Sequence, residues 1–140
     1  MKRILILNGP NLNLQGRRDT SIYGTKTFEG LLHELAARYD GRVAIDYFQT
    51  NIEGEIIDRI QQSEGTYDGI ALNAGGYTHT SVAIRDAIAA VSTPVIEVHI
   101  SSILAREEFR HTSMIAPVAI GSVMGFGLES YRLAIEAFLG

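Results

Sequence analysis

Glu97 and His99 are the residues whose types and spacing most directly suggest chemistry. They lie two positions apart in an apolar run, so on a β-strand both side chains would leave the same face. A carboxylate beside an imidazole fixes the ring tautomer and favours the imidazolium, which makes His99 a candidate general acid. A structural pair at a strand end is the alternative. The backbone N–H groups of Ile100 and Ser101, which follow directly, could bind an anion such as a carboxylate.

A second group of reactive side chains lies in the glycine-bounded segment 16–24. This segment is too long for a simple connector and is typical of a mobile lid. Tyr23 could act as a base if positive charge stabilised its phenolate, because the ordinary pKa of tyrosine is about 10. Arg17 and Arg18 could supply that charge. Solvated arginines and a packed tyrosine are an equally good interpretation of this segment.

Five further residues carry weaker signals. Asn11 belongs to a group of three amides that suits either turn formation or the holding of a water or a polarised carbonyl. Asn73 and His79 bracket two glycines, which let the backbone approach a ligand closely. His79 could equally precede the next helix and form a hydrogen bond with Thr78 or Thr80. Asp86 is interpreted as a helix surface charge or a polar contact at a subunit boundary. Arg110, like Arg106 four positions before it, fits a surface salt bridge on a helical turn.

The elements that must position these residues follow from the alternation of apolar and amphipathic runs. We expect strands at about 3–7, 42–49, 68–72, 94–98 and 117–122. We expect helices at about 27–41, 51–65, 81–91 and 128–139, with a short helical turn at 105–109. Thr27, Asn51 and either Thr80 or Ser81 are the expected N-caps of the first three helices.

Five strands joined by right-handed helical crossovers predict an α/β fold with a single doubly wound parallel sheet. We expect the flavodoxin-like strand order 2-1-3-4-5 for such a sheet. In that order the polar loops after the first, third and fourth strands meet at the carboxyl edge, where open sheets of this kind bind their ligands. Distant parts of the sequence would therefore form one site.

Composition excludes several classes of protein. A chain of 140 residues fits one catalytic domain, 1–140, and its net charge of −4 argues against nucleic acid as a partner. No run approaches the ~18 apolar residues of a membrane span, and the first strand is too short for a signal peptide. The absence of cysteine removes disulfides, thiolate nucleophiles and sulfur-ligated metals and suits a cytoplasmic protein. The two lysines, Lys2 and Lys26, are poorly placed for imine chemistry.

Four runs of the chain closely resemble the type II 3-dehydroquinate dehydratases: NGPNLN at 8–13, NAGGYTHTS at 73–81, EVHIS at 97–101 and REEFR at 106–110. The resemblance covers essentially the whole chain and preserves the order and spacing of the motifs. It implies that 3-dehydroquinate loses water to give 3-dehydroshikimate by an anti elimination through an enolate, without a metal or a cofactor. Whether this serves aromatic biosynthesis or quinate breakdown depends on the cell.

The resemblance also implies catalytic roles for the candidate residues. Tyr23, made acidic by Arg18, would take the proton from the carbon beside the ketone. Asn11 would help to hold a water against the developing enolate oxygen. His99, oriented by Glu97, would protonate the leaving hydroxyl.

The remaining candidates would bind the substrate. By the same resemblance, the amides of Ile100 and Ser101 would bind its carboxylate. Asn73, His79 and Arg110 would hold the ring and its hydroxyl groups.

The family forms trimers that assemble into dodecamers, so Asp86 would reach the site of a neighbouring subunit. The chain departs from the usual family pattern at four positions. Ser102 stands where Asn is common, Leu104 and Ile52 where His is frequent, and Gln15 where an aliphatic residue is usual. We expect these departures to alter affinity more than activity.

Other classes of function fit the sequence less well. A signalling receiver needs an acidic cluster after the first strand, where this chain has Asn8 and Asn11. A flavin or nucleotide carrier needs a phosphate loop, of which Gly-Phe-Gly at 125–127 is only a fragment. A serine hydrolase built on Ser81 or Ser101 would lack the G-x-S-x-G elbow. A non-catalytic assembly module is the remaining alternative.

Overall fold

Five parallel strands form one sheet in the order β2-β1-β3-β4-β5. The strands are β1 (Lys2–Asn8), β2 (Val43–Gln49), β3 (Gly69–Asn73), β4 (Val95–His99) and β5 (Gly121–Met124). They are seen in a computed structural model that describes residues 1–14 and 27–140 of the chain. The doubly wound parallel sheet and the strand order predicted from the sequence are both confirmed.

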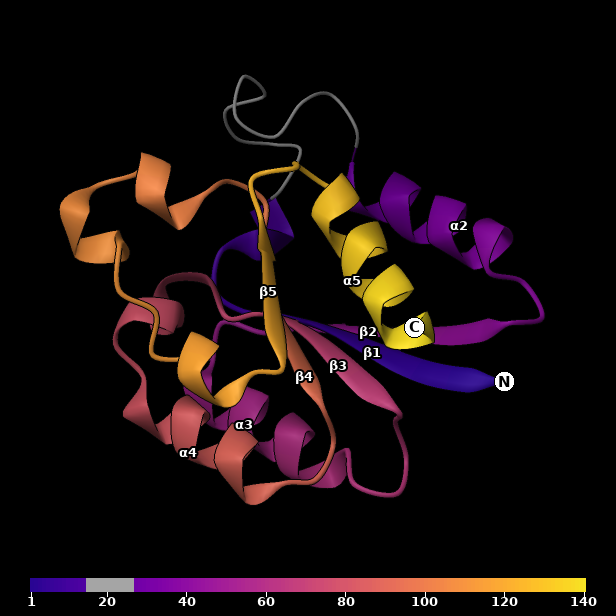
Figure 1. Cartoon of the computed structure of the whole chain (residues 1–140), viewed down its shortest axis with the longest axis horizontal. Helices are drawn as coiled ribbons and strands as arrows, with labels where there is room; N and C mark the ends of the chain where they lie inside the picture. Colours follow the sequence, from indigo (N-terminus) through magenta and orange to yellow (C-terminus); the bar gives the residue numbers. More distant parts are fainter. Residues whose placement is uncertain (15–26) are drawn as a thin grey trace.

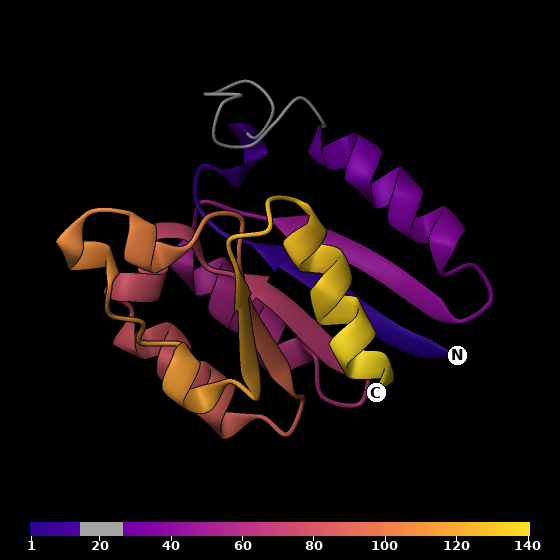
Figure 2. The same cartoon turned by 45° about the horizontal axis from the view of Figure 1, so that its top comes forward.

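Helices cover both faces of the sheet (Figure 1). The helices α2 (Phe28–Arg38) and α5 (Glu129–Leu139) lie on one face. The helices α3 (Glu53–Gln62) and α4 (Val82–Ala90) lie on the other, as the turned view in Figure 2 also shows. Because helices cover both faces of the sheet, the sequences of β1, β3 and β4 are nearly continuous apolar runs.

The alternation of side chains along β1 separates two apolar cores. Ile4 and Ile6 pack toward α2 and α5, where Tyr131 is fully buried. Leu5 and Leu7 pack toward α3 and α4, together with Ile56. Because successive residues of a strand point to opposite faces, one seven-residue strand serves both cores.

Two of the predicted helix caps are confirmed. The Thr27 hydroxyl accepts a hydrogen bond from the Gly30 N–H at 3.0 Å, and the Ser81 hydroxyl accepts one from the Ile84 N–H at 2.9 Å. Each satisfies an N–H group that a helix leaves without an internal partner. Both caps follow from the local sequence.

The prediction that Asn51 caps α3 is wrong. The residue before this helix is Ile52, which provides no side-chain cap and is 59% exposed. The Asn51 Oδ1 instead accepts hydrogen bonds from the Asn11 N–H at 3.0 Å and from Gln49 Nε2 at 3.2 Å. This amide therefore links the loop after β2 to the loop after β1.

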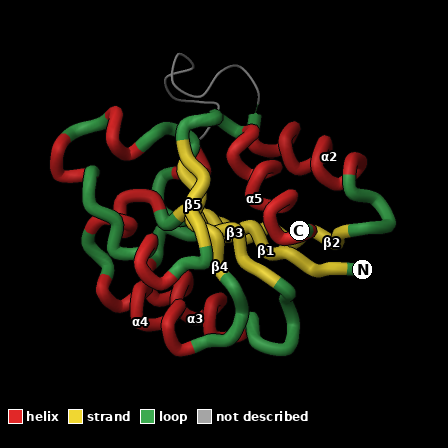
Figure 3. The backbone as a smooth tube through the Cα atoms, in the orientation of Figure 1, coloured by secondary structure: helices red, strands yellow, loops and turns green. Residues whose placement is uncertain are grey.

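The connection from β4 to β5 differs from the predicted strand and turn. It contains the 3-10 turns η3 (Ile103–Ala105), η4 (Glu108–Arg110) and η5 (Ala116–Val118), visible in Figure 3 as short helical pieces. The strand predicted at 117–122 begins only at Gly121. The Ser113 hydroxyl accepts the N–H groups of Ile115 and Ala116 and so starts a turn here. Pro117 also lacks the N–H that a strand would use.

The loops after β1 and β3 touch through their backbones. These loops carry the 3-10 turns η1 (Leu12–Leu14) and η2 (Gly75–His79). The Gly9 N–H donates to the Asn73 carbonyl at 2.7 Å. A Cβ atom at Gly9 would lie 2.6 Å from the Ala74 carbonyl oxygen, and Gly75 adopts a φ of +61° beside Pro10. Only glycine fits either position without displacement of the neighbouring backbone.

A buried polar network lies where α5 crosses the ends of these strands. The Tyr131 hydroxyl donates to Asn8 Oδ1 and accepts from Asn73 Nδ2, both at 2.9 Å. The Asn73 Oδ1 accepts the Gly75 N–H at 3.1 Å. The network holds the Asn73 amide at both of its polar atoms and the Asn8 amide at its oxygen, whereas the buried Asn8 Nδ2 has no hydrogen-bond partner among the described residues.

Replacing Gly9 by Ala should destabilise the protein. The added methyl group must push the loops after β1 and β3 apart, and overpacking of this kind costs about 1–3 kcal/mol. Gly54→Ala is the matched control, because no atom lies within 4 Å of its Cβ position. Since alanine favours a helix by up to about 1 kcal/mol, the control should be neutral or stabilising. Urea unfolding of both variants measures this; equal stabilities would contradict the close approach.

Replacing Tyr131 by Phe should lower the free energy of unfolding by about 1–3 kcal/mol, because two buried amides lose their hydroxyl partner. Tyr39→Phe is the control. Its ring is equally buried, but its hydroxyl donates to the exposed Glu136, which water can solvate. We expect the control to cost less. Thermal or urea unfolding of both variants measures the difference. A larger loss of unfolding free energy in Tyr39→Phe would show that the network contributes little.

Candidate active site

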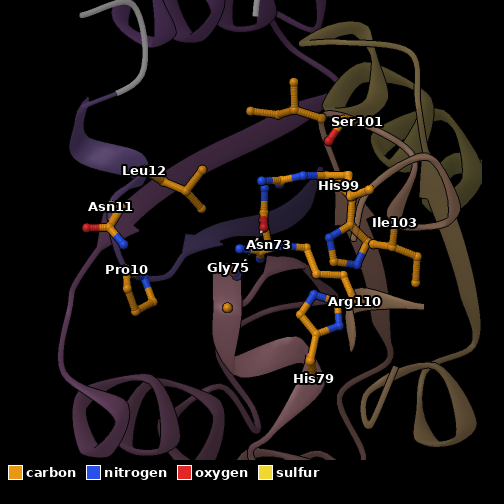
Figure 4. Close-up of a pocket in the computed structure, with 13 residues that line it drawn as sticks. Pro10, Asn11, Leu12, Asn73, Gly75, His79, His99, Ser101, Ile103 and Arg110 are labelled. Carbon is orange, nitrogen blue, oxygen red and sulfur yellow. Dashed lines mark hydrogen bonds between the residues drawn. The ribbon is translucent and has the colours of Figure 1, made fainter. Parts of the chain in front are cut away.

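A cavity of about 200 Å³ lies beyond the carboxyl ends of β1, β3 and β4 (Figure 4). Its lining comes from the three loops after these strands and from the η3–η4 segment: Pro10, Asn11, Leu12, Asn73, Gly75, Gly76, His79, His99, Ile100, Ser101, Ile103, Arg106 and Arg110. Segments that are far apart in the sequence thus share one cavity, as the strand order requires.

The structure brings together most of the residues singled out in the sequence. Seven of them line the cavity: Asn11, Asn73, His79, His99, Ile100, Ser101 and Arg110. Glu97 lies behind His99 and is bonded to it. Asp86 is exposed on α4 and is not part of the lining. Tyr23, Arg18 and the predicted lid at 16–24 lie outside the described residues.

His99 and Glu97 form a buried pair at the end of β4. The His99 Nε2 lies 2.8 Å from Glu97 Oε2, and the side chains are 9% and 1% exposed. An ionised carboxylate can only accept, so Nε2 carries the hydrogen of this bond. The other ring nitrogen, Nδ1, is then the one available to a ligand. This is the geometry that the spacing of two residues on a strand predicts.

Glu97 remains ionised although it is buried inside the protein. Burial acts to raise the pKa of its carboxyl group, but hydrogen bonds from His99, Ser113 and Ser122 lower it more. The net pKa lies below the ordinary value of a glutamate. The Ser113 hydroxyl donates to Oε2 at 2.5 Å, and the Ser122 hydroxyl donates to Oε1 at 2.6 Å.

The cavity is positively charged in a chain whose net charge is −4. Among the described residues, the lining contains the side chains of Arg106, Arg110, His79 and His99 and no carboxylate. Arg110 also bonds the exposed Glu107 at 2.9 Å, so its predicted surface salt bridge and its place in the lining are both present. Such a lining suits a small anion.

His79 is held in a defined orientation. Its Nδ1 lies 2.8 Å from the Thr112 carbonyl oxygen, which can only accept, so Nδ1 carries the hydrogen. The hydrogen bond to Thr78 or Thr80 that the sequence allows is replaced by this longer-range contact. Nε2 is left as the nitrogen that can meet a ligand.

Asn11 is the only described non-glycine residue with a positive φ, at 70°. This left-handed conformation is uncommon outside glycine, although asparagine tolerates it. Asn51 accepts the Asn11 N–H, and Gln49 Nε2 donates to both Asn51 Oδ1 and the Gly9 carbonyl. The strained loop is therefore supported from the end of β2.

Several residues of the site were missed in the sequence. Arg106 was assigned only to surface salt bridging, although its spacing of four from Arg110 signals a shared face of a turn. Ser113 and Ser122 carry no local signal, because their importance depends on where Glu97 lies.

Among the described residues, no group of three or more metal-binding side chains occurs, and no helix is long and apolar enough to cross a membrane.

Ser102 and Leu104, two of the departures from the usual family pattern, adjoin the cavity without lining it. The Ser102 hydroxyl accepts the Leu104 N–H at 3.3 Å, and the Leu104 side chain is 66% exposed. Since Ile100 and Ser101 line the cavity and these two residues do not, the substitutions leave the backbone of the possible anion site in place.

The sequence is similar to many proteins of one kind. A family model described as Dehydroquinase class II matches residues 2–139. A protein from an Exiguobacterium species named 3-dehydroquinate dehydratase is 53% identical over 137 residues, which cover 98% of this chain and 94% of that protein. A protein of the same name from Bacillus licheniformis is 52% identical over 140 residues, with coverages of 99% and 97%.

Solved structures give the same result. The type II dehydroquinase from Butyrivibrio crossotus superimposes with a TM-score of 0.94 at 44% identity and covers 99% of this chain and 98% of its own. The type II dehydroquinase from Propionibacterium acnes gives a TM-score of 0.91 at 38% identity, with coverages of 98% and 95%. Sequence and fold agree, and the chain belongs to the class II dehydroquinase family.

Proposed function

We propose that this enzyme dehydrates 3-dehydroquinate reversibly to 3-dehydroshikimate, by an anti elimination through an enolate. The observation that carries the proposal is the buried His99–Glu97 pair at the wall of a positively charged cavity. The names of its relatives support the overall reaction. The mechanism rests on the physical requirements of the elimination and on the residues that meet them.

An elimination beside a ketone has three requirements. The proton on the carbon next to the carbonyl is acidic only because the resulting anion spreads onto oxygen, so the site needs a base and a stabiliser for that oxygen. Hydroxide is a poor leaving group and needs an acid. In the proposal Tyr23 is the base, with Arg18 stabilising its phenolate, and Asn11 helps to hold a water against the enolate oxygen.

His99 is the proposed acid. Its Nδ1 proton moves to the departing hydroxyl oxygen as the carbon–oxygen bond breaks, and the electron pair of the enolate forms the new carbon–carbon double bond. Water leaves, and the imidazole is left neutral with its hydrogen on Nε2, where Glu97 holds it. Glu97 favours the charged form of the ring before the transfer, since a buried anion attracts the imidazolium.

The substrate carboxylate is assigned to the backbone N–H groups of Ile100 and Ser101, which follow β4 directly. Asn73, His79 and Arg110 are assigned to the ring and its hydroxyl groups. The defined orientations of Asn73 and His79 support this, because hydrogen bonds within the protein hold the Asn73 amide at both polar atoms and the His79 ring at Nδ1.

We also propose a cytoplasmic homo-oligomer, a dodecamer built from trimers, in which Asp86 reaches the site of a neighbouring subunit. Support comes from large apolar side chains exposed on the surface, among them Ile52, Val82, Leu104 and Phe126. The exposed position of Asp86 on α4 fits a contact between subunits. The pathway, aromatic biosynthesis or quinate breakdown, is set by the cell.

The test of the proposed function is the ultraviolet absorbance of the enone carboxylate formed on addition of 3-dehydroquinate. We expect the absorbance to rise, and to rise equally with a chelator or borohydride present, because no metal or imine is used. No rise would contradict the dehydratase, and inhibition by either reagent would contradict the mechanism. Labelling of a serine by a fluorophosphonate would favour a hydrolase instead.

Tyr23→Phe should lower kcat by at least about 100-fold, the smallest contribution typical of a general base. Binding of product-like acids should persist, because only a proton acceptor is removed. Tyr39→Phe is the control, since Tyr39 packs beneath α2 and bonds Glu136 far from the cavity. The same absorbance assay measures both, and a near-normal kcat in Tyr23→Phe would remove this residue from the mechanism.

A further inference from the structure

The hydroxyl of Ser113 has three hydrogen-bonding neighbours and only one hydrogen. Its oxygen accepts the N–H groups of Ile115 at 3.1 Å and Ala116 at 3.0 Å. Both neighbours are donors, so the hydroxyl hydrogen must point to the third neighbour, Glu97 Oε2, at 2.5 Å. The backbone of the turn therefore fixes Ser113 as a donor to this carboxylate.

Ser122 supplies a second donor from the neighbouring strand. The parallel register of β4 and β5 pairs Glu97 with Ser122, and the hydroxyl lies 2.6 Å from Oε1. On the other side β3 presents Leu72, which is apolar. Each carboxylate oxygen thus receives a hydroxyl hydrogen, and Oε2 also receives that of His99 Nε2.

The buried pair has two forms that differ only in the position of one proton. In one form an imidazolium faces a carboxylate; in the other a neutral imidazole with its hydrogen on Nδ1 faces a carboxylic acid. Burial favours the neutral form, because charged groups lose their water. Only in the charged form is the Nδ1 hydrogen acidic enough to protonate a leaving hydroxyl. The cost of burying the charged form must therefore be offset, because the side chains of Glu97 and His99 are only 1% and 9% exposed.

We propose that Ser113 and Ser122 are positioning residues that keep this proton on His99. They do so by stabilising the Glu97 carboxylate, so that the imidazolium persists until it protonates the leaving group. The role in catalysis rests on the proposed function, whereas the placement of the proton does not. In the neutral form Oε2 would become the hydroxyl oxygen of a carboxylic acid, which is a poor acceptor. The Ser113 hydroxyl hydrogen would then lose its hydrogen bond, because the other two neighbours of this hydroxyl are donors.

Other charged groups do not replace the two serines. Among the described residues, His99 is the only titratable group bonded to Glu97. Arg106, Arg110 and His79 line the cavity with His99 and act on the imidazole side of the pair. Positive charge there disfavours the imidazolium, which increases the need for donors on the carboxylate.

The experiment is ¹⁵N NMR of the histidine rings in the full-length enzyme, with the His99 signals assigned by their loss in His99→Asn. In the wild type Nε2 should carry a hydrogen throughout about pH 5–8, the range in which histidine titrates. In Ser122→Ala the hydrogen on Nε2 should be partly lost, with an equilibrium shift of about tenfold or more, as for other hydrogen bonds to charged groups. Ser122→Thr keeps the hydroxyl and should restore the wild-type signal.

Kinetic measurements separate an effect on the proposed acid from an effect on the proposed base. Ser122→Ala should lower kcat for dehydration by about tenfold, in proportion to the lost imidazolium form. Exchange of the proton beside the ketone with deuterium should continue at the wild-type rate, because that step does not use the acid. Ser113→Ala should act in the same direction. Ser122 is exposed on the edge strand β5, so we expect its alanine variant to fold even if loss of the Ser113 turn unfolds the other.

Ser63→Ala is the control for loss of a serine hydrogen bond, because its buried hydroxyl bonds Ile60 and Thr93 far from the cavity. It should leave the His99 signals and the ratio of exchange to dehydration unchanged. An unaltered Nε2 hydrogen in Ser122→Ala, or altered NMR signals with unchanged kcat, would overturn the proposal. Loss of the Nε2 hydrogen in a protein that forms no enone would support the roles of both serines and refute only the proposed reaction.

Discussion

The buried carboxylate of Glu97 is the constraint on which the rest of the site depends. An isolated charge in a protein interior is costly, so it persists only where donors surround it. Here the donors come from β4, from the turn before η5 and from β5, through His99, Ser113 and Ser122. One charge thereby links the strand that carries His99 to the long connection between β4 and β5.

The same connection gives the cavity its electrostatic character. It contributes Arg106 and Arg110 to the lining, and through the Thr112 carbonyl it orients His79. An acidic chain thus presents a local positive site, and Glu97, the one buried carboxylate in the part of the chain that the structure describes, lies behind His99 rather than in the cavity. A carboxylate ligand entering the cavity meets donors and cations first, and Glu97 is shielded from it by the ring that it orients.

The sequence predicts what depends on neighbouring residues and fails where contacts join distant segments. The strand runs, the caps at Thr27 and Ser81 and the Glu97–His99 pair follow from local periodicity and residue type. Asn51 has the features of a helix cap, but its side-chain oxygen accepts a hydrogen bond from the N–H of Asn11 in another loop. Ser122 gains its partner only through the register of β4 and β5, which an incorrect start for β5 conceals.

The geometry of the cavity also bears on where the base must stand. An anti elimination needs acid and base on opposite faces of the substrate, and rigid placement of both lowers the barrier. In Figure 4 His79 and His99 both lie on the side away from Pro10, Asn11 and Leu12, so the two imidazoles do not form an opposed pair. The described lining contains no tyrosine and no carboxylate. The proposed base, Tyr23, lies outside the described residues, and the described lining offers no competing tyrosine or carboxylate for that role.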